Sequence, residues 1–284
     1  MDVVATVERM QARADEIRAE GETIALTPTM GYLHEGHLSL IQTGKAHADR
    51  LVLSIFVNPT QFGPDEDLDA YPRAMERDLA MAESSGVDVV FAPLERELYG
   101  PHFQTFVSLD RLPNHLCGIS RPVHFRGVAT VVTKLFNIVK PHVAVFGEKD
   151  YQQLQVVRRM AADLNFDVEI IGAPTVREPD GLAKSSRNAY LTPEQRESGL
   201  TLNRSLERAQ AMAAAGEADP ARIIAAARDL IGAAPHTRID YIEIVDPHTL
   251  ESVEAVEGPV LMALAVQVGK SRLIDNRILV PDGV

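Results

Sequence analysis

Residues 1–176 alternate short apolar runs with segments of helical periodicity, and this alternation limits the possible folds more than any other feature of the sequence. The run Leu51–Val57 is nearly all apolar, as expected for a strand that is buried on both faces of a parallel sheet. Strands that alternate with helices form βαβ units, so we predict a parallel sheet. Its other strands are predicted at 23–26, 88–92, 143–146 and 167–171.

The segments between these runs are predicted to be helices. In residues 3–19 one helical face collects the apolar side chains, which predicts an amphipathic helix that covers the first strand. These side chains are Val3, Val7, Met10, Ala14 and Ile17. Further helices are predicted at about 38–48, 67–83, 128–139 and 153–164.

The pattern changes after Gly181. Thr192 and Pro193 suit the N-cap and first position of a helix to about Ala215, and a second helix is predicted at 220–231. Short strands without helices between them suit an antiparallel sheet, and they are predicted at 241–245, 260–266 and 272–274. We therefore expect an α/β protein in two domains: a Rossmann-like parallel sheet flanked by helices in 1–176, and a smaller α+β domain in 177–284.

Composition narrows the class of protein. The chain has 284 residues and a formal net charge of −12, which argues against a nucleic-acid binder with its usual basic surface. We expect no membrane span, because no apolar run approaches the ~20 residues that one needs. The charged stretch 1–20 lacks a secretory apolar region, and Cys117 is the single cysteine, which excludes an intrachain disulfide. We expect a cytoplasmic enzyme or binding protein of small molecules.

The stretch 27–37 predicts a strand, a tight loop and the start of a helix. Unpaired backbone N–H groups at such a helix start suit a phosphate. His34 and His37 are three residues apart, which places them on one helical face, and Gly36 lets a ligand approach the backbone. Read alone, the pair is also compatible with a capped helix that carries two solvated histidines. Zinc is disfavoured, because Cys117 is the only thiol and no third ligand stands at metal spacing.

Three further polar strings follow predicted strands, at 58–61, 147–153 and 176–187. The carboxyl ends of parallel strands meet at one edge, where ligands bind, so we expect these strings to converge on one site. Asn58 and Gln61 suit hydroxyl and carboxylate recognition, with turn chemistry as the alternative. Lys149 suits a phosphate and Asp150 a ribose hydroxyl, with an exposed helix start as the alternative.

Two basic clusters stand out in this acidic chain. Lys184, Ser185, Ser186 and Arg187 combine two hydroxyls with two cations, which suits a polyphosphate, although a solvated loop has the same composition. The second cluster is compatible with either an anion-binding segment or a surface loop, and it consists of Arg121, His124 and Arg126.

These strings together resemble a known family. His34-Glu35-Gly36-His37 is similar to the H-I-G-H element of nucleotidyltransferases and class I synthetases. The ordered strings P-T-M-G-Y-L-H-E-G-H, F-V-N-P-T-Q-F, G-E-K-D-Y-Q-Q, P-T-V-R-E and S-S-R-N resemble the pantothenate synthetase family across essentially the whole chain. The resemblance implies an ATP-dependent ligase that condenses (R)-pantoate with β-alanine through a pantoyl-adenylate, releasing AMP and pyrophosphate. It also implies Mg²⁺ and a homodimer, in which 1–176 binds ATP and pantoate and 177–284 forms a lid.

Carried over residue by residue, the resemblance implies roles for the matched positions. His37 would be the catalytic acid, assisted by His34, while Gln61, Gln153 and Asn58 would hold pantoate and Gln61 would also meet β-alanine. The metal ligands are not assigned. The positions that would bind ATP are Met30, Gly31, Tyr32, Leu33, His34, Glu35, Gly36, His37, Gly147, Glu148, Lys149, Asp150, Val176, Lys184, Ser185, Ser186 and Arg187.

The chain departs from the family pattern at two positions. Lys184 replaces a usual methionine, so the role of its side chain is in question, and Val123 replaces a usual glycine in a loop. Two rival functions remain open. Another small-molecule nucleotidyltransferase would release a nucleotide-linked product, and a nucleotide-sensing protein would bind without turnover.

Overall fold

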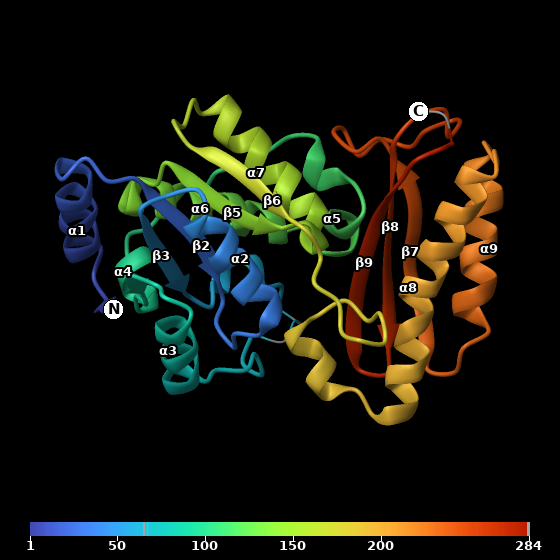
Figure 1. Ribbon diagram of the computed structural model, residues 1–284, viewed down its shortest axis with the longest axis horizontal. Coiled ribbons are helices and arrows are strands. Elements are labelled where there is room, and N and C mark those ends of the chain that lie inside the picture. Colours follow the sequence, from blue (N-terminus) through green and yellow to red (C-terminus); the bar gives the residue numbers. More distant parts are fainter. Residues whose placement is uncertain (65, 67, 283–284) are drawn as a thin grey trace. The chain divides into compact units, whose positions relative to one another are not determined.

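A computed structural model of the chain describes residues 1–64, 66 and 68–282, and Figure 1 shows its helices and strands. The chain divides into two compact units. Unit 1 comprises Met1–Asp110, Arg121–Glu148 and Gln153–Pro174. Unit 2 comprises Arg111–Ser120, Lys149–Gln152 and Thr175–Val284. Two short segments that precede residue 176 therefore group with the C-terminal part, which the predicted division at 176/177 did not include.

Unit 1 is built on a parallel sheet of six strands, which confirms the predicted α/β fold. The strand order is β1-β4-β3-β2-β5-β6. The bounds are β1 Asp2–Val4, β2 Ile24–Thr29, β3 Arg50–Ile55, β4 Val89–Phe91, β5 Val143–Gly147 and β6 Glu169–Ala173. Four of the five predicted strand positions in 1–176 begin within one residue of these bounds and the fifth within two, whereas β1 was not predicted.

Helices cover both faces of this sheet. β2 lies inside the sheet, with β3 on one side of it and β5 on the other. The chain passes from β2 to β3 and then β4 in one direction across the sheet, and from β5 to β6 in the opposite direction. Since parallel crossovers are right-handed, this reversal puts α2 and α3 on one face and α1, α6 and α7 on the opposite face. The bounds are α1 Val7–Ala19, α2 Glu35–Lys45, α3 Met75–Ser84, α4 Glu95–Leu98, α6 His124–Val139 and α7 Tyr151–Asp163, with short 3₁₀ turns η1 Pro59–Gln61 and η3 Glu148–Asp150.

The core on the α2 side of the sheet is apolar. Leu51 and Leu53 of β3 pack with Ile41 of α2, and all three side chains are almost fully buried. Burying a side chain of this size stabilises a fold by roughly 1.5–3 kcal/mol. This packing anchors β3 in the core, and the residues that follow its carboxyl end continue from a buried strand.

Unit 2 contains an antiparallel sheet of three strands in the order β7-β8-β9, as predicted for the C-terminal part. Its strands are β7 Thr237–Val245, β8 Val260–Val268 and β9 Ser271–Leu279. Apolar side chains of α8 and α9 pack on this sheet in a second core. The other elements of unit 2 are α5 Cys117–Ser120, α8 Pro193–Ala214, α9 Pro220–Gly232, η2 Leu112–Asn114 and η4 Ser186–Tyr190.

Three helix predictions need correction at their N-terminal ends. Val3 is not helical: it lies in β1, which pairs with β4, and α1 begins only after Thr6, whose hydroxyl accepts a hydrogen bond from Arg9 N. The helix predicted from residue 67 begins at Met75, beyond Pro72, and residue 67 itself lies outside the described residues. The helix predicted from 128 begins earlier, at His124.

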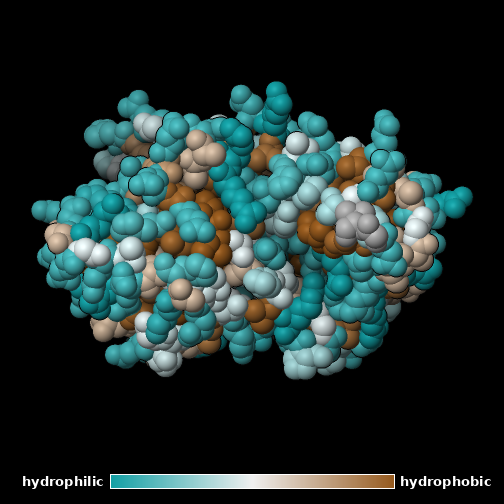
Figure 2. Space-filling view, turned by 45° about the horizontal axis from the view of Figure 1, so that its top comes forward, coloured by the Kyte–Doolittle hydropathy of each residue, from teal (hydrophilic) through white to brown (hydrophobic). Residues whose placement is uncertain are grey.

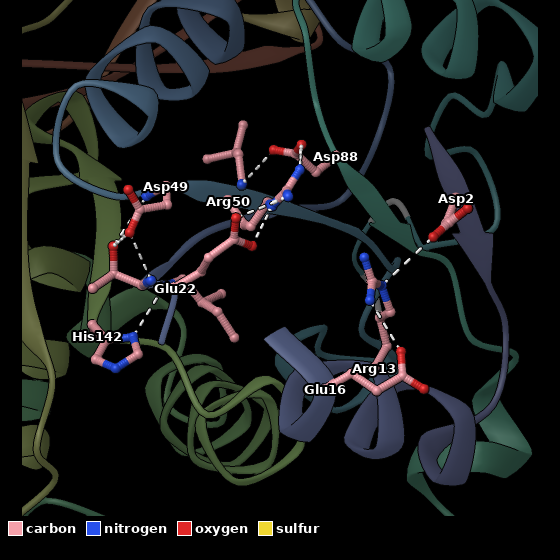
Figure 3. A network of polar contacts seen from close by, with 11 residues as sticks. Asp2, Arg13, Glu16, Glu22, Asp49, Arg50, Asp88 and His142 are labelled. Atoms are coloured by element: carbon pink, nitrogen blue, oxygen red, sulfur yellow. Dashed lines mark hydrogen bonds and ion pairs between the residues drawn. The ribbon is translucent and has the colours of Figure 1, made fainter. Parts of the chain in front are cut away.

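Polar side chains join the amino ends of the strands (Figure 3). Arg50 binds the Glu22 carboxylate through Nε and Nη2, at 2.6 and 2.9 Å, and Asp88 through Nη1 at 3.3 Å. Asp49 accepts hydrogen bonds from the hydroxyl and backbone N–H of Thr23, and these bonds hold the pKa of Asp49 below its usual value. The polar groups at the amino ends of the strands are therefore paired with one another. In sheets of this type a ligand binds at the opposite edge, beyond the carboxyl ends of the strands.

His142 makes the stability of this edge of the sheet depend on pH. Its Nδ1 accepts the Ile24 N–H at 2.9 Å, and the Arg18 guanidinium lies 3.0 Å from its Nε2. Burial and Arg18 lower the pKa of His142, although Asp167 and Asp49 act in the opposite direction. The folded pKa is then below the unfolded value of about 6.5, so the stabilisation is present above that pH and is lost as pH falls through the folded pKa.

We therefore expect His142→Asn, whose Oδ1 can accept the same N–H but does not titrate, to lose less thermal stability than the unmodified chain between about pH 7 and about pH 5. Circular dichroism melts at both pH values measure this difference. His248→Asn is the matched control, because His248 is an exposed histidine of unit 2. An equal loss of stability in the unmodified chain and in His142→Asn would contradict the assignment.

Figure 2 shows that hydrophilic residues cover most of the visible face, with hydrophobic residues gathered in several separate patches. Among the described residues, no helix combines the length and apolar character that crossing a membrane requires.

Candidate active site

The loop after β2 has an unusual backbone that one acidic side chain holds. Gly31 and Tyr32 both have positive φ angles, 83° and 51°. The carboxylate of Asp78 in α3 accepts hydrogen bonds from the backbone N–H groups of Tyr32, at 2.7 Å, and Leu33, at 2.8 Å. The Thr29 hydroxyl accepts a further bond from Gly31 N at 3.2 Å. Left-handed conformations are costly for residues other than glycine, so these bonds fix the loop in a shape it would not adopt alone.

His34 and His37 are brought together at the start of α2 by capping. His34 has an extended backbone and is the N-cap, so it does not lie on a helical face beside His37 as we expected. Its Nδ1 accepts the Gly36 N–H at 3.1 Å, and His37 Nδ1 accepts the His34 N–H at 3.3 Å. The two ring centroids are 4.1 Å apart. The pair thus forms a reciprocal capping box in which Glu35 and Gly36 occupy the first helical positions.

This capping decides which nitrogen of each ring is a donor. A neutral imidazole has one N–H and one acceptor nitrogen, and in both rings Nδ1 is the acceptor. Each neutral ring therefore carries its hydrogen on Nε2, where it can be donated to an anion. The capped-helix interpretation and the anion-binding interpretation are consequently compatible, because the cap uses one nitrogen and orients the other.

The turn after β3 is organised by Asn58, which is 1% exposed. Its amide donates to Gln61 Oε1 and to the Gly127 carbonyl, both at 3.1 Å. Its Oδ1 accepts from the hydroxyls of Thr60, at 3.0 Å, and Tyr99, at 2.8 Å. Both amide hydrogens and both lone pairs of Asn58 are thus used inside the protein, so the structure supports a role in orienting Gln61 rather than in holding a ligand.

Gln61 lies in η1 and is 7% exposed. Its Nε2 lies 3.1 Å from Sδ of Met30, which belongs to the loop after β2. Its backbone carbonyl accepts from Arg121 Nη2, at 3.3 Å, and from His124 Nδ1, at 3.0 Å. Arg121 also forms an ion pair with Glu66 at 2.6 Å. Of the second basic cluster, Arg121 and His124 therefore hold the Gln61 turn, and sequence reasoning did not identify this role.

Gly127 lets α6 approach this turn closely. A Cβ atom at Gly127 would lie 2.3 Å from the Thr60 carbonyl oxygen and 2.5 Å from Gln61 N. A glycine inside an apolar helical pattern was a signal of such an approach that we did not use. Val123, which replaces a usual glycine, has φ −90° and ψ −16°, a conformation open to any residue, so valine is accommodated without backbone strain.

The carboxyl end of β5 brings a second predicted string beside the first. β5 pairs with β2, and the crossovers of the sheet reverse between these two strands. Open α/β sheets bind ligands at this kind of switch point. Gly147 is the last residue of β5 and Glu148 follows it, and a Cβ at Gly147 would lie 3.9 Å from a methyl group of Leu40 in α2. Gln153 lies in α7 and is partly buried.

Unit 2 contains the remaining predicted site residues. Lys149 and Asp150 lie in η3, with their charged groups 3.8 Å apart. The Lys149 carbonyl accepts a hydrogen bond from Asn276 Nδ2 of β9 at 2.9 Å. The neighbouring Asp275 binds Arg177 through two bonds, at 2.6 and 2.9 Å. Two adjacent residues of β9 thus bind two predicted site segments: Asn276 binds the one with Lys149, and Asp275 binds the one with Val176 and Arg177. Neither of these two β9 residues was predicted from the sequence.

The loop 183–188 is held by Glu178. Lys184 N donates to the Val176 carbonyl at 2.9 Å, and the Lys184 ammonium lies 3.9 Å from Glu178 Oε1. The same carboxylate accepts from Asn188 Nδ2, at 2.8 Å, and Arg196 Nη2, at 2.7 Å. Burial raises the pKa of Glu178, but the bonds from Asn188 and Arg196 outweigh it and hold this pKa below its usual value.

Within the same loop Ser185 caps η4, because its hydroxyl accepts the Arg187 N–H at 3.3 Å. Ser186 is the first residue of η4. The loop therefore presents Ser186 and Arg187 on a short capped turn, while the charge of Lys184 is directed to Glu178.

We expect Lys184→Met to leave kcat/KM for ATP within a few-fold, because the Lys184 charge is matched by Glu178 and its backbone N–H remains. Arg187→Ala is the comparison variant and should weaken ATP-dependent turnover. A charge-assisted bond to phosphate contributes roughly 1.5–3 kcal/mol, or ~10-fold or more. A loss beyond about tenfold in Lys184→Met would mean that its side chain binds the phosphates.

Comparison with known proteins identifies the family of this chain. The model of the family described as pantoate-beta-alanine ligase matches residues 2–278. The chain belongs to the pantoate-beta-alanine ligase family. It is 62% identical to the pantothenate synthetase of Desulfatibacillum aliphaticivorans over 99% of this chain and 100% of that protein. It is 54% identical to the pantothenate synthetase of Geobacter sulfurreducens over 98% and 99% of the two chains.

Solved structures of pantoate-beta-alanine ligases have the same fold. The pantothenate synthetase of Thermus thermophilus superposes with a TM-score of 0.94 at 44% identity, over 99% of this chain and 100% of that chain. The ligase of Francisella tularensis, described as complexed with beta-gamma ATP and beta-alanine, has a TM-score of 0.81 at 32% identity, over 98% and 97% of the chains. The expected fold and family are therefore confirmed. The individual site assignments stay predictions.

Proposed function

We propose that this chain condenses pantoate with β-alanine at the expense of ATP. In the first step a pantoate carboxylate oxygen attacks the α-phosphorus of ATP, and the bond to the β-phosphate breaks to release pyrophosphate. In the second step the β-alanine amine attacks the acyl carbon of the adenylate, loses a proton, and AMP leaves. The observation that carries this proposal is the match to the ligase family across residues 2–278.

The His34–His37 capping box supports the first step. Phosphoryl transfer needs charge neutralisation and alignment more than covalent help from the protein. The N-terminus of α2 contributes the positive end of its helix dipole, and each neutral ring carries an Nε2–H donor. We assign these donors to the ATP phosphates, with His37 as the acid. Ser186 and Arg187 are assigned to the polyphosphate, and Gly147–Asp150 with Val176 to adenosine.

Mg²⁺ enters this proposal as part of the substrate MgATP. Magnesium is commonly bound through substrate phosphates and one or two carboxylates. Within the described part of the chain, no group of three or more His, Cys, Asp or Glu side chains could hold a metal ion. We further propose a cytoplasmic homodimer, which sedimentation of the purified protein and fractionation of cells would test.

The decisive experiment measures AMP and pyrophosphate formed from ATP with pantoate, with and without β-alanine. We expect pantoate-dependent ATP–pyrophosphate exchange, and stoichiometric AMP and amide only when β-alanine is present. A nucleotide-linked product without an amide would favour the rival nucleotidyltransferase. ATP binding without consumption would favour a nucleotide sensor.

Gln61 is expected to act on pantoate rather than ATP, because an amide suits hydroxyl and carboxylate recognition. Gln61→Ala should raise the pantoate KM more than the ATP KM, and Gln153→Ala should do the same. Steady-state titration of each substrate measures both constants, and Gln42→Ala, at an exposed glutamine of α2, is the control. A larger effect on the ATP KM would refute the assignment of Gln61.

A further inference from the structure

We propose that Asp78 is a positioning residue for adenylate formation, because it sets the loop from which the His34–His37 capping box starts. The inference rests on the proposed function, since it assigns to His34 and His37 the contact with ATP phosphates. Asp78 belongs to α3 and lies 45 positions from Leu33 along the chain, so no local pattern joins it to the histidines.

Asp78 is 1% exposed, and each of its two carboxylate oxygens accepts one loop N–H. Oδ2 binds Tyr32 N and Oδ1 binds Leu33 N. A carboxylate accepts at both oxygens, whereas an asparagine amide accepts at one and donates at the other. Asparagine has nearly the same shape as aspartate, but its amide N–H would face one of the two loop N–H groups. One of the two hydrogen bonds to the loop would therefore be lost.

The loop bonded to Asp78 leads directly into the capping box. Leu33 precedes His34, so its orientation sets where the N-cap begins. Arg77, the neighbour of Asp78, donates from Nη2 to the Leu33 carbonyl at 2.8 Å, and its guanidinium lies 4.9 Å from the centre of the Tyr32 ring. At Gly31 a Cβ atom would lie 3.0 Å from Asp78 Oδ2. One turn of α3 thus holds both polar backbone groups of Leu33.

Loss of the Asp78 hydrogen bonds is expected to raise the free energy of the transition state for adenylate formation. A displacement of about 1 Å in a positioned group can cost about 10²-fold in rate. We therefore expect Asp78→Asn to lower the kcat of pantoate-dependent pyrophosphate release by up to about 10²-fold, with a much smaller change in the pantoate KM. Glu76→Gln, at an exposed position of the same helix, is the matched control and should change neither constant.

A double-mutant cycle separates positioning from general destabilisation. If Asp78 acts through the histidines, Asp78→Asn should cost less than about threefold in a His37→Ala background, because the positioned group is already gone. Penalties that multiply in the double variant would overturn the proposal. If Asp78→Asn does not fold, Arg77→Ala serves in the same cycle, since Arg77 is exposed yet binds the same loop.

The controls also separate this proposal from the proposed function. The unmodified chain must show pantoate-dependent pyrophosphate release. If it does not, the proposed function itself is wrong. If the unmodified chain releases pyrophosphate normally and folded Asp78→Asn has an unchanged kcat, only the positioning role of Asp78 is contradicted.

Discussion

His37→Ala is expected to lower the rate of adenylate formation by about 10²–10³-fold, and His34→Ala by a similar factor, since each removes one preorganised donor from the phosphate site. ATP–pyrophosphate exchange in the presence of pantoate measures this step without β-alanine. The alanine variants also lose part of the cap of α2, which costs about 0.5–2 kcal/mol of stability.

Two further variants remove the imidazole but keep the cap. Asparagine is among the best N-cap residues, so His34→Asn can still accept the Gly36 N–H. Glutamine at the third helical position completes a capping box, so His37→Gln can still accept the His34 N–H. We expect both to melt close to the unmodified chain and yet lose activity as the alanine variants do. Near-normal exchange by these two folded variants would show that the rings serve only the helix.

Arg177→Met should destabilise the fold by about 3–5 kcal/mol, because it leaves the Asp275 carboxylate buried without its cation. The Asp275 side chain is 2% exposed and the pair is bidentate. The Arg177 Nη1 also donates to the Gly181 carbonyl at 3.1 Å, so the turn before the 183–188 loop loses a bond as well. Urea unfolding followed by circular dichroism measures the change.

The double variant Arg177→Met with Asp275→Leu tests the origin of that loss. Replacing both partners of a buried ion pair by apolar residues is often nearly neutral, so we expect it to recover most of the stability. If the double variant is as unstable as Arg177→Met, the uncompensated charge of Asp275 is not the cause.

Strand ends were the most predictable part of this protein. Runs such as Leu51–Val57 identify buried strands, and the polar residues after them had to lie on one edge of a parallel sheet. The three-residue spacing of His34 and His37 correctly placed them together. The reason was different, because reciprocal capping joins them and His34 lies outside the helix.

The residues that support the site could not be read from local pattern. Asp78 binds the loop after β2, and Asn276 binds Lys149, across separations of 45 and 127 positions. Carboxylates and amides of this kind are common on exposed helices and strands, and only the tertiary fold selects these as partners. Val3 was placed in a helix because its spacing fits one, whereas pairing with β4 makes it a strand.

A gene fragment that begins at Thr175 would not encode all of unit 2. It would omit Arg111–Ser120 and Lys149–Gln152, which belong to that unit. Gln152 donates to the carbonyls of Leu112 and His115, and accepts from Cys117 N, so these two segments hold each other. Unit 2 therefore cannot be exchanged between relatives as a cassette cut at one point. A chimera must carry the coding sequence from residue 111 onward, and with it strands β5 and β6 of the other unit.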